Sequence, residues 1–237
     1  MSGFGVPPLT RGVKWLGVIT LAVSILIRVF GDAGHEFKAA AEFVPAALAH
    51  GRVWQLVTYT FINTEPFNLI FALLGLWMIG GMLEREWGTR RFIIFYFLTS
   101  VAGALATAAI GIFSETVAHF GYTGNWSAIE GLIAAFAVVM PNAQILLYLF
   151  PVQAKWMLPI SAGITVLFML MTGWQPYLPQ LFGLGAGVLF AGGVSPGNVF
   201  LRAKVWWIDR RLRRNRQRVV RGDDVRSGSR GSDKYLH

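Results

Sequence analysis

The chain contains no cysteine and few charged residues. The absence of cysteine excludes a disulfide framework, a thiolate zinc site and a cysteine nucleophile. Only 14% of the 237 residues are charged, whereas 54% are hydrophobic and the mean hydropathy is +0.52. A soluble domain of this size carries more charge than this, so the composition indicates an integral membrane protein.

The basic residues are concentrated at the end of the chain. The formal net charge is +9, and 12 of the 21 lysines and arginines follow residue 200. An arginine-rich run can bind RNA, but its position directly after an apolar segment favours lipid headgroups over nucleic acid as the partner. We expect residues 203–220 to form an amphipathic helix on anionic lipids, followed by a disordered tail. Its headgroup contacts would be Arg210, Arg211, Arg213 and Arg214.

Six apolar segments predict six transmembrane helices. They are Val13–Phe30, Pro66–Met82, Phe92–Phe113, Ser127–Met140, Trp156–Thr172 and Leu178–Gly193. The first could begin a cleaved signal peptide, but its length and the lack of a small-x-small cleavage site favour a retained helix. The fourth is about 21 Å long at 1.5 Å per residue, which is short for a bilayer, so we expect other helices to surround it.

The connection between the first two segments is long and semi-polar. We expect its Ala-rich piece, Phe37–Ala49, and its apolar end, Trp54–Phe61, to lie in the membrane interface. In the six-span arrangement only Arg28, Lys38 and Arg52 face the side opposite the other 18 basic residues. The positive-inside rule therefore predicts cytoplasmic termini. The expected fold is an all-α polytopic membrane domain in residues 1–200, with a basic tail in residues 201–237.

The stretch GYTGNWSAIEGL, residues 121–132, resembles a motif of the rhomboid intramembrane serine proteases. In that family a Gly-x-Ser-Gly loop opens a helix that continues as Ala-Ile-Phe/Tyr-Gly-Leu. The resemblance extends from about Gly51 to Phe190 and includes LEREWGTRRF and PNAQILLYLFPVQAKW. It implies the rhomboid six-helix fold, in agreement with the hydropathy pattern.

The resemblance implies that the catalytic groups have been replaced. The nucleophilic serine corresponds to Trp126, after Gly124, and the catalytic histidine corresponds to Gln180. The oxyanion-stabilising histidine and asparagine correspond to Asn68 and Ala72. Glutamine has no basic lone pair that could activate a hydroxyl, so we expect no catalytic residue. We also expect no metal and no cofactor.

Ser127 and His119 are the residues from which an unorthodox protease site could be built. Ser127 falls on the second glycine of the family motif, and none of the four histidines lies in a predicted span. His119 is the one nearest to Ser127 in sequence. The alternative interpretation of His119 is a solvated loop histidine.

Glu130 is the second unusual residue, because a carboxylate in a membrane helix is costly and needs a polar partner. We expect the Gln180 amide to donate to Glu130, either to fix helix packing or to form a partner-binding surface. We expect the Trp126 indole to plug the former active site, with Asn68, Glu130 and Gln180 as its polar rim. The resemblance also implies that Gly183 and Gly187 let the sixth helix approach the fourth.

These observations favour a proteolytically inactive rhomboid-like protein that binds transmembrane segments of partner proteins. Two other classes of function remain open: a structural subunit of a larger membrane complex, and an active protease with an unorthodox site.

Overall fold

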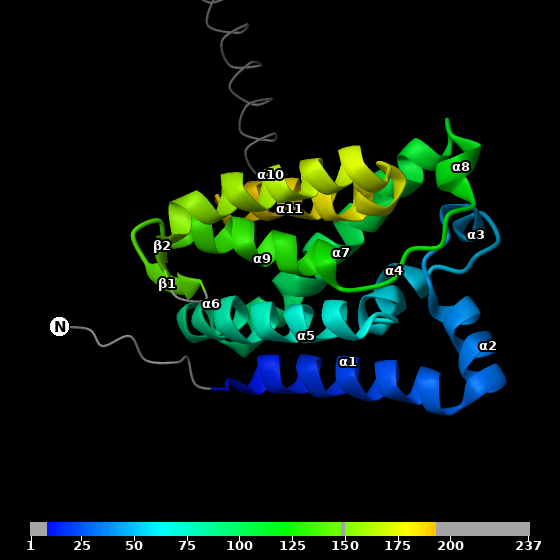
Figure 1. Cartoon of the computed structure of the whole chain (residues 1–237), viewed down its shortest axis with the longest axis horizontal. Helices are drawn as coiled ribbons and strands as arrows, with labels where there is room; N and C mark the ends of the chain where they lie inside the picture. Colours follow the sequence, from blue (N-terminus) through cyan, green and yellow to red (C-terminus); the bar gives the residue numbers. More distant parts are fainter. Residues whose placement is uncertain (1–8, 148–149, 193–237) are drawn as a thin grey trace, which may run out of the picture. The chain divides into compact units, whose positions relative to one another are not determined.

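The computed structural model describes residues 9–147 and 150–192, which form a bundle of helices (Figure 1). The predicted basic tail, with its four headgroup arginines, lies outside the described residues. The apolar helices are α1 (Arg11–Val29), α5 (Pro66–Gly75), α6 (Gly81–Trp87), α7 (Thr89–Gly111), α9 (Trp126–Val139), α10 (Ala154–Thr172) and α11 (Leu178–Ala191). A π-helical turn, η2 (Leu76–Gly80), joins α5 to α6, so that Pro66–Trp87 is one continuous span.

The all-α polytopic fold is confirmed. By length and composition four spans can cross a membrane: α1, Pro66–Trp87, α7 and α10. Helices α9 and α11 have 14 residues each, so the count of six transmembrane helices stays a prediction. The turn before α10 is an antiparallel hairpin in which β1 (Gln144–Leu147) pairs with β2 (Phe150–Gln153).

The connection after α1 is built from short helices. They are α2 (Gly31–Ala41), α3 (Pro45–Leu48), α4 (Gln55–Thr58) and the 3-10 turn η1 (Tyr59–Phe61). Phe37 and Trp54 are exposed, whereas Phe43 and Tyr59 are buried with their rings 5.7 Å apart. A hydrogen bond from the Trp54 indole to the Ala40 carbonyl, 3.0 Å, joins the start of α4 to α2.

Helix α9 lies at the centre of the bundle, as its short length predicts. It contacts α5, α7, α10 and α11, and ten of its 14 residues are buried. A helix of about 21 Å cannot expose its ends to a hydrocarbon layer of about 30 Å without leaving backbone groups unpaired, so protein surrounds it.

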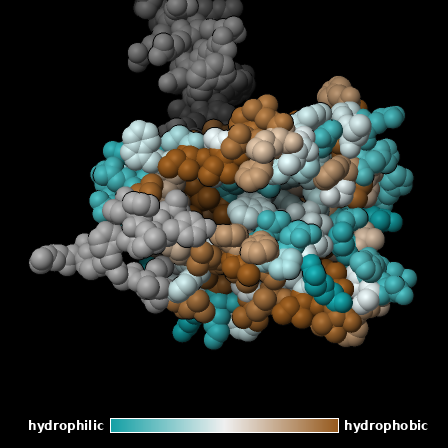
Figure 2. Space-filling model, in the orientation of Figure 1, coloured by the Kyte–Doolittle hydropathy of each residue, from teal (hydrophilic) through white to brown (hydrophobic). Residues whose placement is uncertain are grey.

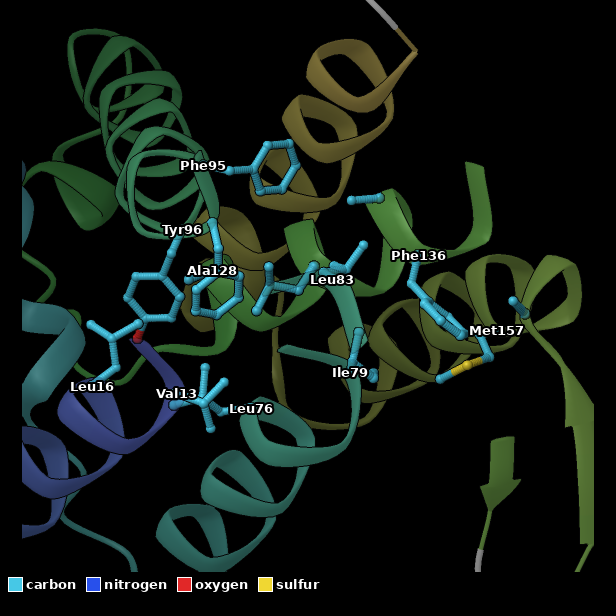
Figure 3. Close-up of a cluster of buried hydrophobic side chains, with 14 residues drawn as sticks. Val13, Leu16, Leu76, Ile79, Leu83, Phe95, Tyr96, Ala128, Phe136 and Met157 are labelled. Atoms are coloured by element: carbon cyan, nitrogen blue, oxygen red, sulfur yellow. The ribbon is translucent and has the colours of Figure 1, made fainter. Parts of the chain in front are cut away.

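The main hydrophobic core joins α1, the Pro66–Trp87 span, α7, α9 and α10. Figure 3 shows Leu16, Leu76, Tyr96, Ala128 and Phe136 within this core. Large apolar side chains also point outward, and Figure 2 shows patches of exposed apolar residues between hydrophilic ones on the viewed face. Apolar side chains both in the core and on the surface are expected of helices that face lipid.

Candidate functional site

A cavity of about 430 Å³ lies beside the N-terminal half of α9. Its walls come from η1, α5, the loop before α9, α9, α10, the 3-10 turn η3 (Gln175–Tyr177) and α11. The lining residues are Tyr59, Asn68, Phe120, Gly121, Tyr122, Thr123, Gly124, Trp126, Ser127, Glu130, Ile164, Thr165, Phe168, Pro176, Tyr177, Pro179 and Gln180. The lining therefore combines aromatic rings with hydroxyl, amide and carboxylate groups.

Local backbone geometry sets where α9 begins. Gly124 has φ +99°, a conformation that side chains disfavour, and its N–H donates to the Tyr59 carbonyl at 3.0 Å. Asn125 is buried at the N-cap position, and α9 starts at Trp126. An antiparallel bridge between Phe43 and Tyr122 fixes the preceding loop to the first connection. The loop therefore places Trp126 and Ser127, the first residues of α9, at the cavity.

The structure brings six of the seven predicted active-site positions to one cavity. Ser127 and Glu130 are buried, Trp126 and Gln180 are partly exposed, and Asn68 is exposed. Gly124 also contributes to the wall, whereas Ala72 is fully buried in α5 and does not reach the cavity.

The prediction that Trp126 plugs this space is wrong. The indole is one wall of the cavity, and about 430 Å³ stays open beside it. The physical reason is position, because Trp126 is the first residue of α9. The direction of a helical side chain depends on the rotation of its helix, and at this position the indole lines the cavity instead of filling it.

The predicted hydrogen bond between Glu130 and Gln180 is also wrong. The Glu130 carboxylate accepts from Thr165 Oγ1 at 3.2 Å and from Ser161 Oγ, both on α10. Ser161 and Thr165 are four residues apart, so both hydroxyls lie on one face of α10. Sequence reasoning missed them because serine and threonine in an apolar helix usually bond to their own backbone and give no distinct signal.

Ser127 does not form a nucleophile–base pair with a histidine in the described structure. Its hydroxyl is buried without a hydrogen-bond partner among the described residues, and no histidine lines this cavity. The His119 ring is exposed, with Nδ1 3.1 Å from the Glu115 carbonyl oxygen. The loop interpretation of His119 therefore holds. His237 lies outside the described residues.

Gly183 and Gly187 lie where α11 packs against α9. A Cβ atom at Gly183 would be 2.2 Å from the Ser127 carbonyl oxygen, and one at Gly187 would be 2.4 Å from the Gly131 carbonyl oxygen. Both distances are far below van der Waals contact with backbone atoms, so only glycine permits this approach.

Buried hydroxyl and amide groups surround the start of α9. Tyr59 donates to the Ser100 carbonyl at 3.0 Å and accepts from Ser100 Oγ at 2.8 Å. The Tyr122 hydroxyl and Asn125 Nδ2 are buried without a hydrogen-bond partner in the described part of the chain. Burial raises the pKa of Tyr122 to about 12.

Glu84 is a second buried carboxylate, in helix α6 at the end of the Pro66–Trp87 span. It accepts from the backbone N–H groups of Gly12 at 2.7 Å and Val13 at 2.9 Å, and from the hydroxyls of Thr10 and Thr89. These donors include the first turn of α1, so Glu84 caps that helix across more than 70 residues of sequence. No local pattern could have indicated this contact.

No metal centre is visible in the described ranges, 9–147 and 150–192. They contain no group of three or more histidine, cysteine, aspartate or glutamate side chains that could hold an ion.

Comparison with known proteins relates most of the chain to rhomboid-like proteins. It is 26% identical over 166 residues to rhomboid-like protein 19 of Arabidopsis thaliana, covering 63% of this chain and 54% of that protein. It is 27% identical over 133 residues to rhomboid-like protease 3 of Toxoplasma gondii, covering 54% of this chain and 50% of that protein. It is 26% identical over 99 residues to inactive RHOMBOID-like protein 8 of Arabidopsis thaliana, covering 37% of this chain and 28% of that protein.

The chain thus spans about half the length of the first two relatives. A family model described as "Eukaryotic integral membrane protein (DUF1751)" matches residues 14–191, which include every cavity-lining residue and all of the spans apart from the first three residues of α1. The chain belongs to this family of integral membrane proteins and is rhomboid-like.

Proposed function

We propose that this protein is a proteolytically inactive rhomboid-like membrane protein that uses the cavity beside α9 to bind transmembrane segments of partner proteins. The observation that carries the proposal is the cavity itself. It stays open, but Trp126 and Gln180 stand in it where the family resemblance puts the serine and histidine. A space that cannot supply an activated nucleophile but can still admit a side chain is suited to recognition.

The polar atoms of the cavity support binding within the membrane. Glu130, Gln180 and Asn68 each present polar groups to a space bordered by apolar helices. Polar groups at such sites are expensive and mark functional positions. One relative also carries "inactive" in its name, and this supports the loss of proteolysis.

We infer that both termini face the cytoplasm, because 18 of the 21 basic residues fall on that side of a six-span arrangement. The C-terminal arginines would then contact anionic lipids of the cytoplasmic leaflet. Cysteine labelling tests this orientation in a chain that has no cysteine. An impermeant reagent applied to intact cells will label a cysteine at Ser114 and spare one at Ser229, and the reverse result would invert the topology.

Proteoliposomes test the proposed function directly. The purified protein is reconstituted with a single-span protein that active rhomboid proteases cleave, and both cleavage and association are measured. The expected result is association without cleavage, unchanged by Ser127→Ala. Cleavage that Ser127→Ala abolishes, or labelling of Ser127 by a fluorophosphonate, would identify an unorthodox protease instead.

Purification in mild detergent separates binding from a structural role. A binding protein will recover varied partners in substoichiometric amounts. A fixed set of partners at equal stoichiometry would identify a subunit of a larger complex.

A further inference from the structure

The cavity contains one carboxylate and no cation. Among its described lining residues none is lysine, arginine or histidine, and Glu130 is its one acidic side chain. Glu130 is 5% exposed and is held by two hydroxyls from a single helix. Two neutral donors compensate a buried carboxylate only in part, because charge-assisted pairing with a cation is stronger.

Aromatic rings line the same space. Phe168 and Tyr177 are stacked, with ring centroids 6.1 Å apart and an interplanar angle of 18°. Phe120 and Tyr122 lie on the loop side with centroids 4.9 Å apart, and Trp126 adds an indole. Aromatic faces attract cations, and a carboxylate among such rings forms a site for an organic cation.

One buried hydroxyl at the cavity has no partner within the described structure. The Tyr122 hydroxyl is contributed by a residue that is 3% exposed and lines the cavity. Buried polar atoms without partners are rare in native proteins, and this one points to a ligand that supplies the missing hydrogen bond. The Tyr122 hydroxyl is independent of Glu130, since it does not bond to it.

We infer that the cavity selects transmembrane segments that carry a lysine or arginine, whose cationic head pairs with Glu130. The inference rests on the proposed function and names the chemical class of partner. A lysine or arginine side chain has an apolar stem and a charged end, which match the Ile164 and Phe168 wall and the Glu130 carboxylate, respectively. A free divalent cation fits less well, because a single carboxylate supplies too few oxygen ligands for it.

Model transmembrane peptides test this inference in nanodiscs of phosphatidylglycerol. The probes are poly-Leu/Ala helices of about 20 residues that are identical except for one position inside the apolar segment, occupied by lysine, norleucine or glutamate. Energy transfer from a dye on Ala49→Cys, at an exposed position, reports binding to the unaltered cavity. We expect the lysine peptide to bind at least about tenfold more tightly than the norleucine peptide, and the glutamate peptide to bind most weakly.

Two variants assign the preference to one residue. Glu130→Gln keeps the shape and a hydrogen-bond acceptor but removes the charge, so the lysine peptide should bind as weakly as the norleucine peptide. The matched control Glu115→Gln changes an exposed carboxylate outside the cavity lining and should leave the preference intact. A lysine preference that survives Glu130→Gln would overturn the inference.

The remaining outcomes separate this inference from the proposed function. Equal binding of lysine and norleucine peptides to the wild-type protein would overturn the cation preference and leave segment binding in place. No binding of any peptide would overturn both. Loss of lysine-peptide binding when phosphatidylcholine replaces phosphatidylglycerol would make the choline headgroup the preferred cation and would overturn the inference as well.

Discussion

Glu84 and Glu130 are both buried carboxylates in apolar helices, and the protein compensates them in different ways. Glu84 accepts four hydrogen bonds, two from backbone N–H groups and two from threonine hydroxyls. Glu130 accepts two, both from hydroxyls of α10, and it borders an open cavity. Glu84 therefore joins α6 to α1 and α7, whereas Glu130 can still accept a hydrogen bond from another donor.

The comparison shows that burial alone does not identify function. Their exposed fractions are 4% and 5%, so accessibility does not distinguish the two side chains. What distinguishes them is the number of donors and the space beside the carboxylate. A fully satisfied carboxylate stabilises the fold, and a partly satisfied one beside a cavity is a candidate for recognition.

Removing Glu84 should have the largest effect on stability. Glu84→Leu leaves two backbone N–H groups and two hydroxyls without their acceptor, at about 1 to 3 kcal/mol for each group that finds no other partner. We expect a loss of at least about 3 kcal/mol in the free energy of unfolding, measured by denaturation in detergent. The control Glu86→Leu, at an exposed position in the same helix, should change stability by less than about 0.5 kcal/mol. Equal effects of the two variants would show that the cap of α1 is not important.

The glycines between α11 and α9 should have the next largest effect. Gly187→Ala forces a methyl group against the Gly131 backbone, and overpacking of this kind costs about 1 to 3 kcal/mol. Gly185→Ala is a matched control two residues away in α11, where an added Cβ meets nothing within 4 Å. We expect Gly185→Ala to be neutral or stabilising in thermal unfolding because alanine favours helices more than glycine does. Similar losses for both variants would contradict the close packing of α11 on α9.

Glu130→Leu should destabilise the protein less than Glu84→Leu does. It removes the acceptor of Ser161 and Thr165, but both hydroxyls can bond to carbonyl groups of their own helix. We expect a loss of about 1 to 2 kcal/mol in the same denaturation measurement, together with loss of partner binding. A loss as large as that of Glu84→Leu would mean that Glu130 is structural.

Ser127→Ala should have the smallest effect. The hydroxyl has no hydrogen-bond partner among the described residues, so its removal leaves no other group unpaired. Thermal stability should change by less than about 0.5 kcal/mol, and the absence of cleavage should persist. A large loss of stability would show that Ser127 takes part in a hydrogen bond that this conformation lacks.

The sequence predicted the arrangement of the bundle better than the contacts inside it. Apolar segments locate spans because burial in lipid needs long apolar helices, and the segment boundaries agree with α1, α7 and α10 within a few residues. The family resemblance identified six positions, distant in sequence, that line one cavity, because helices connected in the same order pack in the same arrangement.

Side-chain partners were not predictable from the same patterns. The acceptor role of Glu84 depends on contacts with residues more than 70 positions away. The partners of Glu130 are on α10 instead of α11 because the direction of a side chain depends on helix rotation, which hydropathy does not specify. The indole of Trp126 lies on the cavity wall for the same reason, since its direction depends on the rotation of α9.

Site-specific photo-cross-linking tests the central claim, binding without cleavage, most directly. A photoreactive phenylalanine analogue replaces Phe168, which lines the cavity, or Phe113, which is 91% exposed at the end of α7 and outside the lining. Each variant is reconstituted with a single-span protein that active rhomboid proteases cleave. The account predicts a strong adduct of full-length mass from position 168, little adduct from position 113, and no cleaved fragment. Equal adducts from both positions, or a cleaved fragment that disappears with Ser127→Ala, would contradict it.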